Sequence, residues 1–212
     1  MRPAYVRPTH LIITVHGIRT FGQWQERLAK LIRSAEPTAR VCNYHYGYFS
    51  IIAFMIPFLR WIVTRRFRHA LIAEASNANW DRIDIVAHSF GTHLVAWAIH
   101  EMNVDTRPRI HTVILAGSVL KPWFPWSDLI GKGVYRLVND CGTKDGILIL
   151  NQLFVLFSGM AGRIGFNGMT NEQFRNRFFA FGHSGYFVKK YTLDDSFMKE
   201  SWIPLLCGTA SA

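Results

Sequence analysis

Cysteine is scarce in this chain of 212 residues, and acidic side chains are outnumbered by basic ones. The three cysteines, Cys42, Cys141 and Cys207, are widely spaced and form no C-x-x-C pair, which argues against a disulfide framework and a zinc site. No apolar run reaches the ~20 residues of a membrane-spanning helix. The start, MRPAYVRPTH, lacks the apolar stretch and cleavage site of a signal peptide. We therefore expect a cytoplasmic protein without a transmembrane helix.

Internal repeats, low-complexity tracts, linkers, Gly-rich phosphate loops and nucleic-acid-binding modules are also missing. The net charge of +10 comes from basic residues spread through the chain, so we expect no nucleic-acid partner. Basicity of this kind favours an acidic partner, an acidic substrate or peripheral contact with an anionic membrane. Half of the residues are hydrophobic and 18% are charged, which predicts a single domain over residues 1–212.

Strand-like and helix-like segments alternate along the chain. Apolar runs predict strands over residues 11–15, 41–46, 83–87, 111–116, 135–138 and 178–181. Helices are expected over 24–32, 90–102 and 147–157. Strands without a polar face, separated by helices, predict the α/β class with a doubly wound, mostly parallel sheet that is covered on both sides.

The segment DIVAHSFGTHL places Ser89 between a predicted strand and a predicted helix. A sharp turn at this point, with small neighbours at Ala87 and Gly91, is what a nucleophile elbow requires. The alternative is an ordinary helix N-cap, in which the hydroxyl accepts a hydrogen bond from the first turn. A nucleophile would also need an oxyanion site, a base and an acid.

An oxyanion site is predicted where the first strand ends in His16-Gly17-Ile18-Arg19. Gly17 lets the backbone turn, so that the N–H of Ile18 and the N–H of Phe90 form a pair of donors. Arg19 is a candidate for the substrate pocket. An ordinary strand-ending turn is the alternative interpretation of His16-Gly17.

His183 is the candidate base, because it lies between glycines after a short apolar strand. His16, His88 and His93 also fall near the predicted cleft but form no recognisable set of metal ligands, so we expect no metal. In the segment VNDCGTKDG, two aspartates compete for the role of the acid. Asp145 is favoured over Asp140 because a carboxylate in the loop beyond the strand can orient a histidine better than one at the strand end.

These motifs, VHGIRTFGQWQERL, AHSFGT, VNDCGTKD and GHSGYF, resemble the α/β-hydrolase superfamily in type and order, and more narrowly a group of microbial α/β-hydrolase domains. The resemblance implies a serine esterase, lipase or related acyl hydrolase with Ser89 as nucleophile, His183 as base and Asp145 as the residue that orients it. It implies no cofactor. The elbow begins with Ala87 where the family usually has glycine. The chain starts at the HG strand, so we expect a compact fold without the family's first strands.

The expected mechanism is hydrolysis of a carboxylic ester or thioester through an acyl-enzyme. Two apolar segments, 48–70 and 119–133, could form a wall or lid that selects a lipid acyl chain, with Trp123 and Trp126 lining the pocket. Both segments could equally pack in the core. Arginines in the first segment favour peripheral contact with an anionic membrane. The alternative function is a non-catalytic binding module with the same fold.

Overall fold

The computed structural model describes residues 9–17, 23–45, 56–147, 159–168, 171–187 and 197–208. Within them a six-stranded sheet has the order β2-β1-β3-β4-β5-β6, and every neighbouring pair is parallel. The strands are β1 (His10–Val15), β2 (Arg40–Tyr44), β3 (Arg82–His88), β4 (Ile110–Ala116), β5 (Val134–Gly142) and β6 (Phe174–Phe179). The sheet confirms the predicted α/β class.

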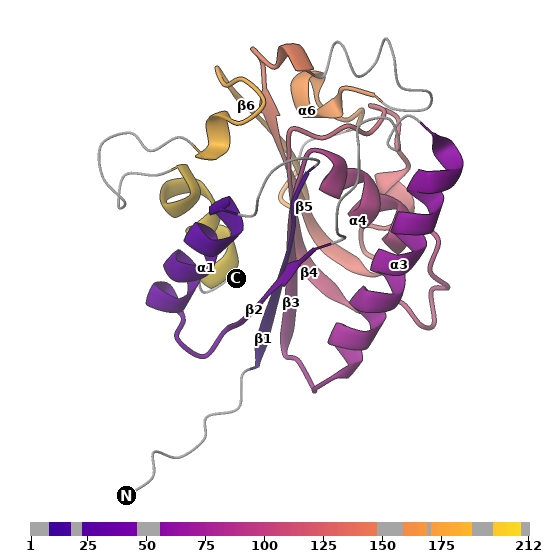
Figure 1. The fold of residues 1–212 in the computed structure, drawn as a ribbon, viewed down its shortest axis with the longest axis vertical. Helices are drawn as coiled ribbons and strands as arrows, with labels where there is room; N and C mark the ends of the chain where they lie inside the picture. The colour runs from indigo at the N-terminus through magenta and orange to yellow at the C-terminus, as the bar shows by residue number, and fades with distance from the viewer. Residues whose placement is uncertain are drawn as a thin grey trace, which may run out of the picture.

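Helices cover both faces of this sheet (Figure 1). One face carries α1 (Gln23–Ala35), the π-helical turn η3 (Met198–Trp202) and α7 (Ile203–Cys207). The other carries α3 (Pro57–Ser76) and α4 (Phe90–His100). Each face has its own apolar core, because the strand residues alternate between the two sides. Shorter helical turns are η1 (Trp126–Asp128), α6 (Ala161–Ile164) and η2 (Gly185–Phe187).

The predicted bounds are wrong for two strands. β5 continues through Asn139 and Asp140 to Gly142, although its apolar run stops at Val138. β6 begins at Phe174 rather than Phe178 and ends before Phe181. Both strands continue through polar residues whose side chains bond one another, as Asn139 Nδ2 does with Asn176 Oδ1 at 3.0 Å. Of the helix predicted over 147–157, residues 148–157 lie outside the described part of the chain.

The strand order reverses between β1 and β3, because the chain leaves β1 toward β2 on one side and continues with β3 on the other. Ligands of open parallel sheets bind where such a reversal opens a crevice at the carboxyl ends of the strands. Gly17 follows β1 and Ser89 follows β3 at this position.

The two segments considered as lids pack as follows. Residues 48–55 of the first segment lie outside the described residues, and from Pro57 onward the segment is helix α3. The buried side chains Val63, Phe67 and Leu71 of this helix join the core beneath α4. In the second, Trp126 is buried and Trp123 is exposed.

Candidate active site

Ser89 occupies a strained turn between β3 and α4. Its φ of 54° makes it the single non-glycine residue with positive φ in the described part of the chain. Its amide donates to the carbonyl of Ala116 at 3.0 Å, and its hydroxyl makes no capping hydrogen bond to α4. Strain of this kind persists only where the surrounding structure enforces it, often at functional sites.

Two glycines allow the backbone to pass close to this turn. A Cβ on Gly17 would lie 2.7 Å from Ser89 Cβ and 3.1 Å from Ser89 Oγ. A Cβ on Gly91 would overlap the backbone carbonyl of Val15, at the end of β1. The H-G motif after β1 and the S-x-G motif after β3 therefore form one packed unit.

His183 bridges Ser89 and Asp145. Its Nε2 lies 2.9 Å from Ser89 Oγ, and its Nδ1 lies 2.7 Å from Asp145 Oδ2. A carboxylate can only accept hydrogen bonds, so Nδ1 carries the proton and donates it. Nε2 of the neutral ring is then an acceptor for the Ser89 hydroxyl. This tautomer is the one that can remove a proton from serine.

Asp145 is held in place by the turn that follows β5. Its side chain is fully buried, and its second oxygen, Oδ1, accepts the amide of Ile147 at 3.1 Å. Its own amide donates to the carbonyl of Gly142 at 3.0 Å. The structure thus brings together the three side chains that the sequence suggested.

Asp140 has different partners. Its carboxylate accepts two hydrogen bonds from Arg177, at 2.6 and 2.8 Å, and one from the indole of Trp202 at 2.8 Å. Burial raises the pKa of Asp140, and Arg177 opposes that rise. The side chain of Asp140 therefore joins β6 to η3.

His88 contributes a contact that the sequence did not reveal. Its Nε2–H donates to the carbonyl oxygen of His183 at 2.9 Å, and the two rings lie 4.9 Å apart. Burial, and the nearby charge of His183, lower the pKa of His88 to about 3, so the ring is a neutral donor at ordinary pH. A histidine directly before the candidate nucleophile was the available signal.

The loop that carries His183 has further supports. Gly117, with φ of 57°, lies beneath the His183 ring, where a Cβ would stand 3.3 Å from ring atoms. The hydroxyl of Tyr186 donates to the backbone carbonyl of Asp140 at 3.0 Å, and Arg27 donates to the carbonyl of Phe187. These contacts fix the loop to the sheet and to α1.

The remaining predicted site residues are placed only in part. Phe90 is the first residue of α4, so its amide belongs to the amino terminus of that helix. Ile18 and Arg19 lie outside the described residues. Trp126 packs against Phe124, with ring centroids 5.1 Å apart, and Trp123 is 65% exposed beneath Lys121. Their roles at the site stay predictions.

The described residues lack two further features. No group of three His, Cys, Asp or Glu side chains there is placed to hold a metal ion. In the same part of the chain, no helix has both the length and the hydrophobicity to cross a bilayer.

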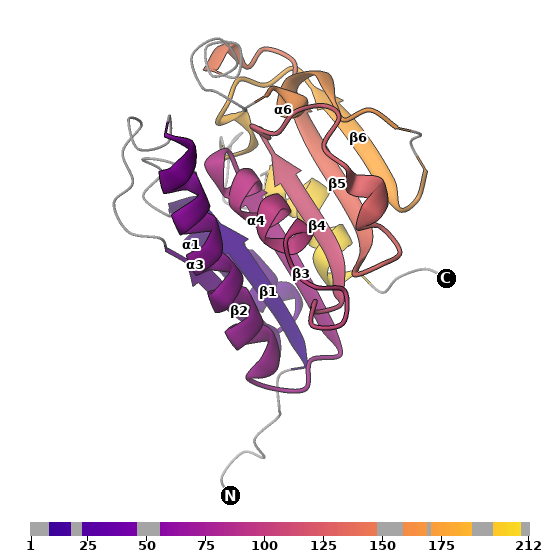
Figure 2. The ribbon, with the colours of Figure 1, turned by 90° about the vertical axis from the view of Figure 1, so that its right-hand side faces the viewer.

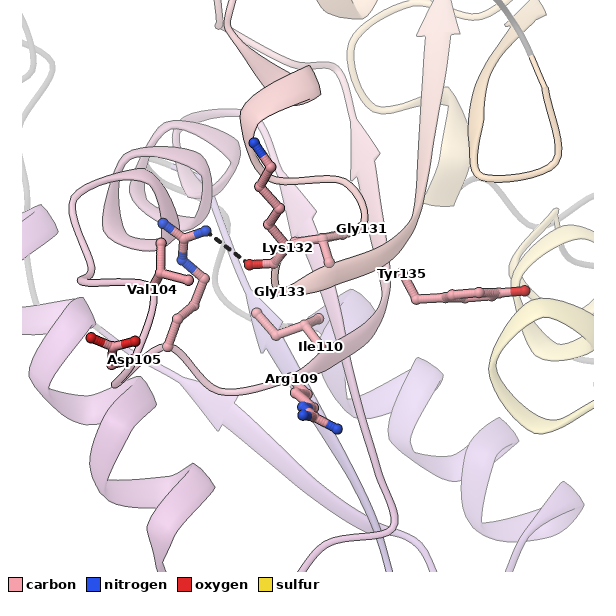
Figure 3. Close-up of a pocket in the computed structure, with 10 residues that line it drawn as sticks. Val104, Asp105, Arg109, Ile110, Gly131, Lys132, Gly133 and Tyr135 are labelled. Carbon is pink, nitrogen blue, oxygen red and sulfur yellow. Dashed lines mark hydrogen bonds between the residues drawn. The ribbon is translucent and has the colours of Figure 1, made fainter.

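A pocket of about 650 Å³ lies at the amino ends of β4 and β5 (Figure 3), whereas Ser89 follows the carboxyl end of β3. Its lining includes Arg109, Lys132 and Tyr135, and Arg107 donates to the backbone carbonyl of Lys132 at 3.2 Å. The pocket therefore does not belong to the candidate site.

No protein-family model and no curated protein matches the sequence. Solved structures do match the fold. Esterase PE8 aligns with a TM-score of 0.54 and 11% identity, over 84% of this chain and 86% of its own. An uncharacterized protein from Bacillus cereus ATCC 10987 aligns with a TM-score of 0.57 and 14% identity, over 95% of this chain and 61% of its own. The chain shares the fold of these proteins.

Proposed function

We propose that this chain, which has the α/β-hydrolase fold, is a serine hydrolase that cleaves carboxylic esters with Ser89 as its nucleophile. The observation that carries the proposal is the continuous hydrogen-bonded series Ser89–His183–Asp145, at 2.9 and 2.7 Å, at the strand-order reversal. The similarity to esterase PE8 supports the same class of reaction.

The acylation step follows from the tautomer of His183. Ser89 Oγ forms a bond to the ester carbonyl carbon while its proton passes to Nε2, and the carbonyl π electrons move to the oxygen. Asp145 stabilises the imidazolium. When the intermediate collapses, the C–O bond to the alcohol breaks, and the alcohol leaves with the proton from Nε2. The acyl group stays on Ser89.

Deacylation repeats these steps with water. His183 Nε2 removes a proton from water, whose oxygen attacks the acyl carbon. The Ser89–acyl bond then breaks, Ser89 regains its proton and the carboxylic acid leaves.

The oxyanion in both steps needs donors beside Ser89. We assign the amide of Phe90, at the positive end of α4, and the amide of Ile18, directly after Gly17, to this role. In other hydrolases, removal of one such donor costs about 2.7–4 kcal/mol of transition-state stabilisation. The close contact of Gly17 with Ser89 supports the assignment, because Ile18 directly follows Gly17 in the sequence.

The proposal is tested by fluorophosphonate labelling and by turnover. We expect the probe to label the unmodified chain and not the Ser89→Ala variant. Ser34→Ala, which alters an exposed serine on α1, is the matched control and should label fully. Ester and thioester panels with acyl chains of increasing length then define the substrate class. A chain that neither labels nor turns over any of these substrates would indicate the non-catalytic binding module instead.

A further inference from the structure

Helix α3 exposes aromatic side chains on its outer surface. Phe58 is 64% exposed and Trp61 is 44% exposed, and their rings stack with centroids 6.1 Å apart. Arg65 lies over the Trp61 ring at 5.6 Å, and Arg66 is exposed beside it. Phe58, Trp61, Arg65 and Arg66 are called the α3 outer face below. The residues opposite them on the helix, Arg60, Val63, Thr64, Phe67 and Leu71, are buried.

The charge of this helix is of one sign over most of its length. The sequence PFLRWIVTRRFRHALIA contains four arginines and no acidic residue, and the first acid of α3 is Glu74. Of these arginines, Arg60 is buried and Arg68 pairs with Glu101 at 3.0 Å. Arg65 and Arg66 therefore present positive charge next to exposed aromatic rings, the combination found on surfaces that enter anionic lipid interfaces.

The aromatic end of α3 lies at the same edge of the sheet as Ser89. Helix α3 begins at the end of the sheet toward which the strand arrows point (Figure 2). Burial, and to a lesser extent the charge of Arg60, lowers the pKa of His93 to about 3, so Arg60 lies close to the first turn of α4. That turn follows Ser89 directly. The amino-terminal end of α3, which carries the α3 outer face, therefore lies at the same edge of the sheet as the candidate active site, with that face on the side of the helix away from the core.

We propose that the α3 outer face docks on an anionic lipid bilayer and brings Ser89 to esters held in that bilayer. Phe58 and Trp61 enter the interface while Arg65 and Arg66 contact anionic headgroups. The docking stands on the geometry and charge of α3, and the substrate class, lipid esters, rests on the proposed function.

Co-sedimentation with vesicles tests docking without turnover, if the Ser89→Ala variant is used. We expect binding to vesicles of phosphatidylcholine with phosphatidylglycerol, weaker binding at high salt, and little binding to phosphatidylcholine alone. Arg65→Gln with Arg66→Gln should weaken partitioning about 30-fold. Trp61→Ser should weaken it about 10-fold.

Matched controls come from the opposite edge of the sheet, in the pocket of Figure 3. Arg109→Gln with Lys132→Gln removes two exposed charges there, and Tyr135→Ser removes a ring that is 55% exposed. If the Arg109→Gln, Lys132→Gln variant loses as much binding as the α3 arginine variant, or Tyr135→Ser loses as much as Trp61→Ser, binding does not depend on the α3 outer face and the proposal is wrong. It is also wrong if the Ser89→Ala variant with an intact α3 outer face does not bind anionic vesicles. A third contrary result would be light scattering that shows Trp61→Ser to break a dimer.

The two proposals fail in different ways. Vesicle binding without fluorophosphonate labelling of Ser89 would leave docking intact and overturn the hydrolase. Labelling of Ser89 without vesicle binding would support the hydrolase and overturn the docking proposal. If both hold, Trp61→Ser should lower hydrolysis of a vesicle-borne ester about 10-fold and leave hydrolysis of a water-soluble ester unchanged.

Discussion

Replacing Asp145 with asparagine alters one hydrogen bond to His183 and preserves the size of the side chain. Asp145 Oδ2 lies 2.7 Å from Nδ1 and fixes the proton there. The amide NH₂ of the Asp145→Asn variant donates to Nδ1 instead, so the ring proton moves to Nε2. Nε2 then cannot accept the proton of Ser89. We expect kcat to fall about 10⁴-fold, as in the serine-protease precedent, which equals about 5.4 kcal/mol of barrier.

The stability of this variant should change little, because its amide oxygen can still accept the hydrogen bond from Ile147 that Asp145 Oδ1 accepts at 3.1 Å. Asp140→Asn gives the opposite pattern. It breaks a buried ion pair in which Asp140 is fully buried and Arg177 is 23% exposed. Loss of one partner of a buried pair costs about 3–5 kcal/mol, and partial exposure of Arg177 places the cost near 3. For a chain of this size that is a fall in Tm of roughly 6–12 °C.

The assay is turnover of a p-nitrophenyl ester per folded molecule, with a thermal melt of each variant. The expected result is an inactive, stable Asp145→Asn variant and an active, less stable Asp140→Asn variant. The reasoning is refuted if Asp145→Asn keeps more than about a tenth of the original kcat while melting at the original temperature, because the Nδ1 contact would then have no catalytic role.

Three further predictions concern other parts of the structure. His88→Leu removes the N–H that holds the carbonyl of His183 at 2.9 Å, so kcat should fall about 100-fold with a small change in KM. His88→Gln keeps a hydrogen-bond donor and should recover most of the rate. Steady-state kinetics with a soluble ester measure both effects. Because Ser89 has φ of 54°, Ser89→Gly should be about 1 kcal/mol more stable than Ser89→Ala in urea unfolding; equal or lower stability would mean that the turn stores no strain. Burial lowers the pKa of His10, but its bonds to Asp84 and Glu36 outweigh that effect and leave the pKa raised. The stabilisation is present below about pH 6.5 and lost as pH rises through the raised pKa, so the difference in unfolding free energy between the unmodified chain and His10→Gln should shrink at higher pH; a growing difference in urea titrations would contradict it.

The sequence predicted most of the sheet because β1, β3 and β4 are apolar on both sides and therefore stand out from the helices. The bounds of β5 and β6 were harder to predict from the sequence. Asn139, Asp140 and Arg177 look like loop residues, yet each is a strand residue whose polar atoms find partners across the sheet or in η3. Hydropathy alone cannot distinguish a buried polar side chain with a partner from an exposed one.

The candidate site was predictable where chemistry dictates residue type and chain order, as for Ser89, His183 and Asp145. The contact of His88 was not, because its partner is a backbone carbonyl 95 positions away, which carries no signature in residue type. The sequence did predict that the turn at Gly17 lies near Phe90, but the closeness of the packing between Gly17 and Ser89 depends on the pairing of β1 with β3 and could not be predicted.

The packing of Gly17, Ser89 and Gly91 also indicates how this protein can be altered. At Gly17 an added methyl group would meet Ser89, and at Gly91 it would meet a backbone carbonyl, which cannot move aside by changing rotamer. A mutant library aimed at new substrates should therefore keep residues 15–17 and 87–92 constant. Variation belongs at exposed positions such as Trp123, where side-chain size is free to change.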